Sequence, residues 1–418
     1  MKMKLLVLTA LTASMVGCGG GGGGGSSTGS GGTVASSVAS SVTVSSVASS
    51  SVASSVASSK ATPIPVQKTS YLNFKNSGEG PQTMPTGIGF VANEEIRSGF
   101  SFGDFFQDGT IAMVAATNNF TGVHLPDGTQ FFPNAGRVYF FHTDGHGGWV
   151  DRTAELLNDQ TGCITPRKAV VADFNGDGKP DVFLSCHGID AFPVPTGYTE
   201  GEHPRFLMSS NNGTYTNVDA GFNCYCHGAT AAEMNEAGYA DIIVTDQRIS
   251  KQPTLLRNNH GTFTLDKTTM PTSLTPYLLG GIWQARSYFS IELLDINGDG
   301  KYDLVAMGVS DSSHTADSKI FTNDGNNNFT DARSTTLPID PIYINPLDVT
   351  LVNGTLYVYS VDSLYTHIAI TKMDATTLSV LATETYSMVG NYDIAMWLLP
   401  KDGKIYDANI LSLISAPL

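Results

Sequence analysis

Two nine-residue segments of this 418-residue chain repeat one pattern of oxygen-bearing side chains. Segments 173–181 and 295–303 both carry Asp or Asn at positions 1, 3, 5 and 9 and glycine at position 6. Ca²⁺ binds about six to eight oxygens, and glycine permits the sharp turn of such a loop. The sequence therefore predicts two calcium sites. The expected ligands are Asp173, Asn175, Asp177, the carbonyl of Lys179 and Asp181 in the first site, and Asp295, Asn297, Asp299, the carbonyl of Lys301 and Asp303 in the second.

The residues around both loops exclude an EF-hand. Position 12, where an EF-hand needs a glutamate, is Leu184 in one copy and Ala306 in the other. Each loop lies between two short apolar runs typical of β-strands, with 168–172 and 290–294 as the incoming strands. Each loop is therefore expected at the tip of a β-hairpin.

Hairpins with such tips resemble the FG-GAP or VCBS repeats that build integrin-like β-propellers. Two more segments resemble degenerate copies of the repeat. Segment 104–112 has Phe106 and Ala112 at ligand positions, and segment 233–241 has Ala237 at position 5. Both are expected to keep the hairpin and to bind calcium weakly or not at all.

Turn glycines recur along the rest of the chain. Gly109, Gly178, Gly238 and Gly300 are 69, 60 and 62 residues apart, and divergent hairpins around 347–359 and 394–406 continue the series. A second hairpin, marked by a turn ending in glycine, follows each of the first four glycines. Two hairpins make a four-stranded blade. The prediction is an all-β fold, a single propeller of six or seven blades over residues 71–418. A seventh blade would combine the segment around 71–74 with the C-terminal strand.

The N-terminal residues indicate export. Lys2 and Lys4 precede an apolar run, 5–16, that is too short to span a bilayer and ends before Cys18. This resembles a bacterial lipoprotein signal over residues 1–18, with Cys18 lipidated and the chain anchored to the outer membrane on its periplasmic or cell-surface side. The alternative is an ordinary secretory signal. Both place the protein outside the cytoplasm.

Residues 19–70 are expected to form a disordered tether, because this Gly- and Ser-rich stretch cannot bury enough apolar surface to fold. The first 70 residues hold four lysines and no acidic residue, so residues 71–418 carry 19 basic and 38 acidic side chains. A domain this acidic is not expected to bind nucleic acid through a basic patch.

Four further cysteines, Cys163, Cys186, Cys224 and Cys226, are expected to pair as disulfides in an exported protein. The hairpin pattern places all four at the propeller end opposite the calcium loops. Cys186 is expected to bond either to Cys163 or to a member of the 224/226 pair. The repeated Cys-His-Gly at 186–188 and 226–228 offers a second interpretation, a zinc or copper site. The disulfide interpretation is favoured.

No motif of a nucleophilic hydrolase, a zinc protease or a phosphate-binding loop is present in the sequence. The expected function is a surface or periplasmic binding or adhesion module that recognises a protein or glycan on the face opposite the calcium loops. Its recognition residues would lie in the long segments 187–205 and 266–287, which contain Tyr198, Tyr277 and Trp283, with Tyr288 next to them. These aromatic residues could instead pack between blades. The alternative functions are a polysaccharide lyase or hydrolase and, less favoured, a metal or redox role for the Cys/His face.

Overall fold

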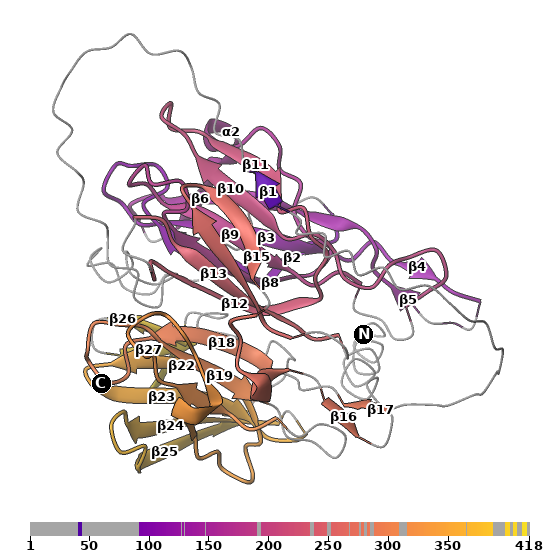
Figure 1. The fold of residues 1–418 in the computed structure, drawn as a ribbon. Coiled ribbons are helices and arrows are strands. Elements are labelled where there is room, and N and C mark those ends of the chain that lie inside the picture. Colours follow the sequence, from indigo (N-terminus) through magenta and orange to yellow (C-terminus); the bar gives the residue numbers. More distant parts are fainter. Residues whose placement is uncertain are drawn as a thin grey trace, which may run out of the picture.

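The chain forms five antiparallel sheets of four strands, and each sheet consists of two hairpins. In the computed structural model these sheets are the blades of a β-propeller (Figure 1). The structure describes residues 41–43 and 92–415 apart from short gaps, the longest being 190–193, 309–315, 388–397 and 408–411. Cys18, most of the expected tether and segment 71–74 lie outside the described residues. The hairpin signals predicted the all-β propeller and its four-stranded blades correctly, but the described residues form five such blades, where six or seven were expected.

The strands of the five blades follow the chain in order. Blade 1 contains β2 (Glu94–Gly103), β3 (Ala112–Asn119), β6 (Ala135–Thr143) and β7 (Trp149–Asp151). Blade 2 contains β8 (Pro166–Ala172), β9 (Asp181–Cys186), β10 (Arg205–Ser209) and β11 (Tyr215–Asp219). Blade 3 contains β12 (Cys226–Ala232), β13 (Asp241–Asp246), β14 (Thr254–Asn259) and β15 (Thr262–Asp266). Blade 4 contains β18 (Tyr288–Leu294), β19 (Asp303–Gly308), β20 (Lys319–Phe321) and β21 (Ser334–Thr336). Blade 5 contains β22 (Asn345–Val352), β23 (Thr355–Val361), β24 (His367–Asp374) and β25 (Val380–Ser387).

Smaller elements accompany the blades. A three-stranded sheet follows blade 5 and contains β26 (Leu398–Lys401), β27 (Lys404–Asp407) and β28 (Ser412–Ser415). Two short hairpins interrupt the connections: β4 (Val123–His124) with β5 (Gln130–Phe131), and β16 (Tyr277–Leu279) with β17 (Ile282–Gln284). The helical turns are α2 (Thr153–Leu156), η3 (Thr272–Leu274) and η4 (Asp331–Arg333). In the described part of the chain, no helix is both long enough and apolar enough to cross a bilayer.

One short strand comes from the expected tether. β1 (Ser41–Thr43) pairs with β15, the outer strand of blade 3 (Figure 1). Residues 19–70 were expected to remain without structure, and these three differ. The edge of β15 offers unpaired backbone groups, and Val42 and Thr43 have side chains that favour strands.

The first strand of each blade contacts the first strand of the next, so β2, β8, β12, β18 and β22 follow one another at the centre. Neighbouring inner strands run in the same direction: between β12 and β18, His227 Nδ1 lies 3.1 Å from the carbonyl oxygen of Phe289 near both strand starts, and the N–H of Leu293 donates to the hydroxyl of Thr230 further along. Loops between first and second strands therefore share one end of the propeller, here called the loop end. The connections between second and third strands, and those between blades, lie at the opposite end, the connection end.

The hydrophobic core lies between blades. Phe206 of blade 2 stacks on Phe263 of blade 3 with ring centroids 4.7 Å apart, and Phe174 contacts both rings. Similar buried clusters join the other neighbouring blades. A charged pair adds to this at the centre, where Lys168 Nζ lies 2.5 Å from Glu292 Oε1 and both side chains are 2% exposed. Blade-by-blade packing explains how about 320 residues form one domain without a thick core.

Candidate functional site

The first predicted calcium loop joins β8 to β9 at the loop end. Its turn is closed by its own side chains: the two Asp173 carboxylate oxygens accept the N–H groups of Gly176 and Gly178 at 2.6 and 2.8 Å. Gly178 has φ +80°, which side chains rarely adopt. Asp177 accepts the N–H of Lys179 and the hydroxyl of Ser209. The acidic side chains therefore gather at one tip.

The second predicted loop joins β18 to β19 with the same local geometry. Asp295 accepts the N–H groups of Asp299 and Gly300, both at 3.0 Å, and Asp299 accepts that of Lys301 at 2.8 Å. The loop is more open than the first, because Asn297 and Asp299 are exposed whereas Asn175 and Asp177 are half-buried. Both predicted loops lie where the sequence placed them.

The last aspartate of each loop has a structural task as well. Asp181 is fully buried and accepts three backbone N–H groups, those of Phe174, Asn175 and Ser209, at 2.6–3.1 Å. It thereby joins the inner hairpin of blade 2 to its outer hairpin, and this link between hairpins is here called the latch. Burial raises the pKa of Asp181 to about 7.

The same latch recurs in blades 3 and 4. Asp303 accepts the N–H of Asn323 at 2.9 Å, and Asp241 accepts that of Asn258 at 2.6 Å. Burial raises the pKa of each of these two carboxyls to about 6. Sequence reasoning treated position 9 only as a calcium ligand. The signal for the latch was present: Asp241 persists in a repeat that lost its oxygen at position 5.

The degenerate loops keep their hairpins, as expected, but use their polar groups differently. In blade 1, Asp104 accepts the N–H groups of Asp108 and Gly109, while Asp108 contacts His142 Nε2 at 2.9 Å. The imidazole of His142 thus already contacts one oxygen of the Asp108 carboxylate. In blade 3, Glu233 accepts the N–H of Gly238.

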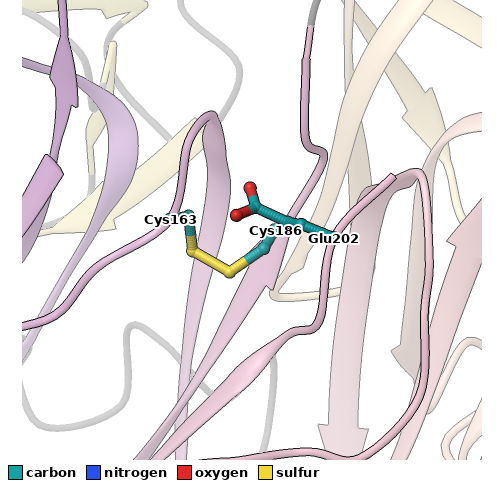
Figure 2. A group of neighbouring side chains, drawn as sticks. All are labelled: Cys163, Cys186 and Glu202. Atoms are coloured by element: carbon teal, nitrogen blue, oxygen red, sulfur yellow. A yellow bond between two sulfur atoms is a disulfide. The ribbon is translucent and has the colours of Figure 1, made fainter. Parts of the chain in front are cut away.

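Across the described residues, one trio of His, Cys, Asp or Glu side chains has ligand atoms within 4.8 Å of one another: Cys163, Cys186 and Glu202 (Figure 2). Its sulfurs already form a disulfide. In the two predicted calcium loops, no three carboxylates lie within this distance of one another, and those of Asp173 and Asp295 accept backbone N–H groups.

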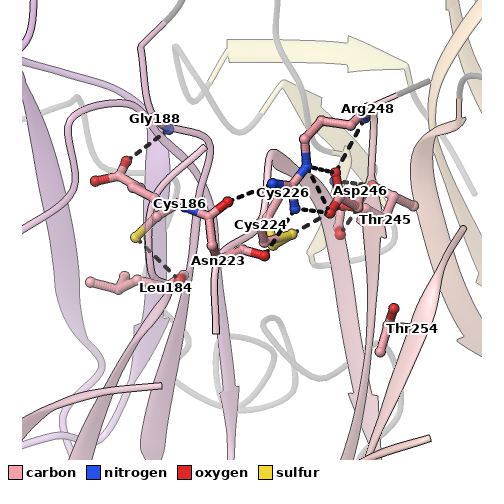
Figure 3. Close-up of a disulfide and its surroundings, with 12 residues drawn as sticks. Leu184, Cys186, Gly188, Asn223, Cys224, Cys226, Thr245, Asp246, Arg248 and Thr254 are labelled. Carbon is pink, nitrogen blue, oxygen red and sulfur yellow. Dashed lines mark hydrogen bonds and ion pairs between the residues drawn. A yellow bond between two sulfur atoms is a disulfide. The ribbon is translucent and has the colours of Figure 1, made fainter. Parts of the chain in front are cut away.

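The four cysteines form two disulfides at the connection end. Cys163 bonds to Cys186 with a Cα–Cα distance of 5.4 Å, and Cys224 bonds to Cys226 with one of 5.0 Å (Figures 2 and 3). The expectation of disulfides is confirmed, and of the two pairings left open for Cys186 the structure has the one with Cys163. No thiolate of these four remains for a Cys/His metal site.

Glu202 fixes the long segment that follows β9. Its carboxylate accepts the N–H groups of Ile164, Thr165 and Gly188 at 2.9–3.2 Å. Its backbone pairs with that of Cys224 in both directions at 3.0 Å. Burial raises the pKa of Glu202, against the effect of these hydrogen bonds. Nothing in the local sequence distinguishes this glutamate, because its partners lie in two other connections.

Polar side chains surround the Cys224–Cys226 disulfide. The guanidinium of Arg248 forms an ion pair with Asp246 and donates to the side chain and backbone of Asn223 (Figure 3). Glu200 lies within electrostatic reach of Arg248 and Asp246, and burial raises its pKa. Acids, amide and guanidinium thus occur together beside the long segment.

The aromatic residues of the long segments have different roles. Tyr198 is 43% exposed, and its ring packs edge-on against the buried Phe131 of β5 at 5.0 Å. Tyr288 is buried between blades 3 and 4, so it belongs to the core. Tyr277 and Trp283 lie in the paired strands β16 and β17, and their side chains lie outside the described ones.

Figure 1 shows the β4–β5 and β16–β17 hairpins projecting from the same side of the molecule. Both interrupt connections at the connection end. The segment that carries Tyr198 also lies there, in contact with β5 through Phe131. The irregular segments of blades 1 and 2 and the connection after blade 3 therefore lie at the end opposite the predicted calcium loops.

No family model and no curated protein matches the chain. A rhamnogalacturonan lyase from Bacillus licheniformis is 12% identical over 82% of this chain and 61% of its own, with a TM-score of 0.36. A second rhamnogalacturonan lyase, YesW, is 12% identical over 81% and 60%, also with a TM-score of 0.36. AztD from Citrobacter koseri is 14% identical over 75% and 79%, with a TM-score of 0.30. The chain thus spans about 60% of the length of the two lyases.

Proposed function

We propose that this protein is a lipid-anchored, calcium-binding propeller of the FG-GAP/VCBS type. In this proposal it stands at the bacterial outer membrane and binds a protein or glycan with its connection end. The observation that carries the proposal is the structural difference between the two ends of the propeller. The loop end repeats one acidic turn, whereas the connection end bears unique, longer segments on a rigid scaffold, as binding loops do.

The donor set of the two complete loops fits calcium. Each loop offers carboxylate, amide and carbonyl oxygens and neither nitrogen nor sulfur donors, the chemistry of a hard cation. In the second loop, burial and then the charges of Asp299 and Asp295 raise the pKa of Asp303. A bound cation would offset this mutual repulsion. Calcium would then hold the turn together and bring no reaction chemistry of its own.

Tyr198 is the proposed centre of the recognition surface. The ring of Tyr198 is partly exposed and packs against Phe131. It therefore offers apolar surface to a ligand and loses little conformational entropy on binding. Glu202 holds the segment in place through three backbone hydrogen bonds. The polar set of Asn223, Asp246 and Arg248 supplies donors and acceptors near the same segment. This combination suits a glycan or a polar protein surface.

The number of blades completes the proposal. The three-stranded sheet β26–β28 follows blade 5, and β26 contacts the inner strand β22. Leu398 of β26 is buried in the same cluster as Tyr359 of blade 5. We take this sheet to be a sixth blade, so that the propeller has six blades or, with a contribution from the chain before residue 92, seven.

A binding screen tests the function. The mature protein is applied to a glycan array and to surface proteins of neighbouring cells, with 1 mM calcium. Tyr198→Ala should weaken any specific binding at least about tenfold without changing the melting temperature. Val150→Ala is the matched control, because Val150 is 46% exposed on the outer strand β7 and far from the connection end.

Two results would contradict the proposal. Equal binding by the wild type and Tyr198→Ala would remove the recognition surface. Turnover of a polysaccharide by the purified protein would favour the enzymatic alternative over a binding module.

A further inference from the structure

His187 and His227, the two histidines of the repeated Cys-His-Gly sequence, meet inside the connection end. His187 follows β9 and His227 lies in the inner strand β12, yet their ring centroids are 5.8 Å apart. The side chains are 2% and 4% exposed. The neighbouring sulfurs form disulfides, and the proposed function does not use the two imidazoles.

A β-bulge directs His227 to this position. Every inner strand of the five blades shifts register near its start, and in β12 the shift falls between Cys226 and Ala229. Bulges re-aim side chains and are common beside functional sites. The corresponding bulge in β8 contains Arg167, and that in β18 contains Phe289. The ring of Phe289 lies 4.7 Å from that of His227.

Hydrogen bonding prepares His227 as a ligand. Its Nδ1 lies 3.1 Å from the carbonyl oxygen of Phe289, which can only accept, so Nδ1 carries the proton and Nε2 keeps a lone pair. Metal-bound histidines are usually oriented by such a bond from their other nitrogen. His187 has a buried Nδ1 with no hydrogen-bond partner, and its ring lies 3.4 Å from that of Tyr225. An unpartnered ring nitrogen at this depth points to a missing ligand.

The pair offers two nitrogen ligands, because no third ligand atom of a His, Cys, Asp or Glu joins it among the described residues. Zn²⁺ is usually held by four ligands, whereas Cu⁺ accepts two. Arg167, in the bulge of β8, lies within electrostatic reach of both rings, and its charge repels a divalent cation about twice as strongly as a monovalent one. Two imidazole ligands and a monovalent charge together indicate Cu⁺.

We propose that His187 and His227 form a two-imidazole binding site for Cu⁺ at the connection end of the propeller. His227 binds through Nε2. His187 binds through Nδ1, its buried nitrogen without a hydrogen-bond partner. The ion enters without a change of oxidation state, and no bond of the protein breaks. The site lies at the end of the propeller opposite the predicted calcium loops.

A competition titration tests the site. The mature, disulfide-intact protein is titrated with Cu⁺ under anaerobic conditions against the coloured chelator bicinchoninate. The wild type should take up one ion, and His187→Gln and His227→Gln should each lose more than about 100-fold in affinity. His203→Gln is the matched control, because His203 is exposed and paired with Asp219 at 2.8 Å. It should bind as the wild type does.

A measurement on the wild type covers the case in which a variant fails to fold. X-ray absorption at the copper edge should show nitrogen neighbours and no sulfur. Sulfur neighbours would place the ion on methionines or cysteines and overturn the proposal, as would unchanged binding by both histidine variants. Tighter binding of Zn²⁺ than of Cu⁺ by the wild type would overturn the assignment of the metal.

Discussion

At the loop end, the carboxylates at position 1 bond to backbone N–H groups of their own turns, whereas at the connection end one disulfide and one glutamate join separate connections. Asp173 closes a turn of six residues, but Cys163–Cys186 ties the connection before blade 2 to the end of β9, and Glu202 reaches two further connections. The loop end is therefore locally organised and charged. The connection end is cross-linked over long distances.

Within the loop end, the polar residues that stabilise the fold can be separated from those available to a ligand. Asp181, Asp241 and Asp303 hold hairpins together whether or not the rest of their loop is complete. The acid at position 1 is half-buried and occurs in all four repeats, whereas position 5 is Ala237 in one repeat and position 9 is Ala112 in another. We infer that the aspartate at position 9 serves the fold, and we propose that the acid at position 5 serves an ion.

The largest expected effect comes from the latch. Asp181→Ala would leave three N–H groups without their acceptor in a buried place, which costs roughly 3–5 kcal/mol of unfolding free energy. Urea denaturation in the presence of a calcium chelator measures it. Asp177→Ala is the matched control in the same loop and should cost less than about 1 kcal/mol without calcium. Equal costs for the two variants would refute the distinction between position 5 and position 9.

The second largest effect concerns the disulfides. Cys163–Cys186 spans 23 residues and Cys224–Cys226 spans two, so the loop-closure entropy predicts stabilisation of about 3 kcal/mol for the first against about 1.5 kcal/mol for the second. The double variants Cys163→Ser/Cys186→Ser and Cys224→Ser/Cys226→Ser are compared by urea denaturation. The reverse order would show that the short bridge constrains more than its own turn.

Much of this fold was predictable because hairpins are encoded locally. Asn-Gly and Asp-Gly turns and alternating apolar residues sufficed to place β8, β9, β18 and β19. The bond of Asp181 to Ser209 and that of Glu202 to Ile164 were not predictable, because they join residues 28 and 38 positions apart with no local signature. The approach of His187 to His227 depends on bulges, which the sequence does not reveal.

Lower pH should weaken the connection end. His227 has a pKa of about 3 in the folded protein and an ordinary value near 6.5 when unfolded, so the unfolded chain binds the proton more tightly between these values. Stability from this group is complete above about pH 6.5 and falls as the pH falls, by about 2 kcal/mol at pH 5. The difference in unfolding free energy between the wild type and His227→Gln, followed from pH 7 to pH 5, isolates it from the buried carboxyls. A difference that does not change with pH would show that the pKa of His227 is the same in the folded and unfolded protein.

The smallest expected effect is the one that tests the ion at the loop end. With a dissociation constant of about 0.1 to 1 mM, as in extracellular modules, 1 mM calcium should stabilise the folded protein by about 1 kcal/mol per site. The variant Asp177→Ala/Asp299→Ala removes position 5 from both complete loops, so its melting temperature should no longer rise with calcium. Asp108→Ala, in the degenerate loop of blade 1 where His142 already engages that carboxylate, should leave the calcium response intact. Calorimetry that counts equal calcium uptake by the wild type and the double variant would remove calcium from these two loops. The turns of the loop end would then be stabilised by the hydrogen bonds between their carboxylates and backbone N–H groups, without an ion.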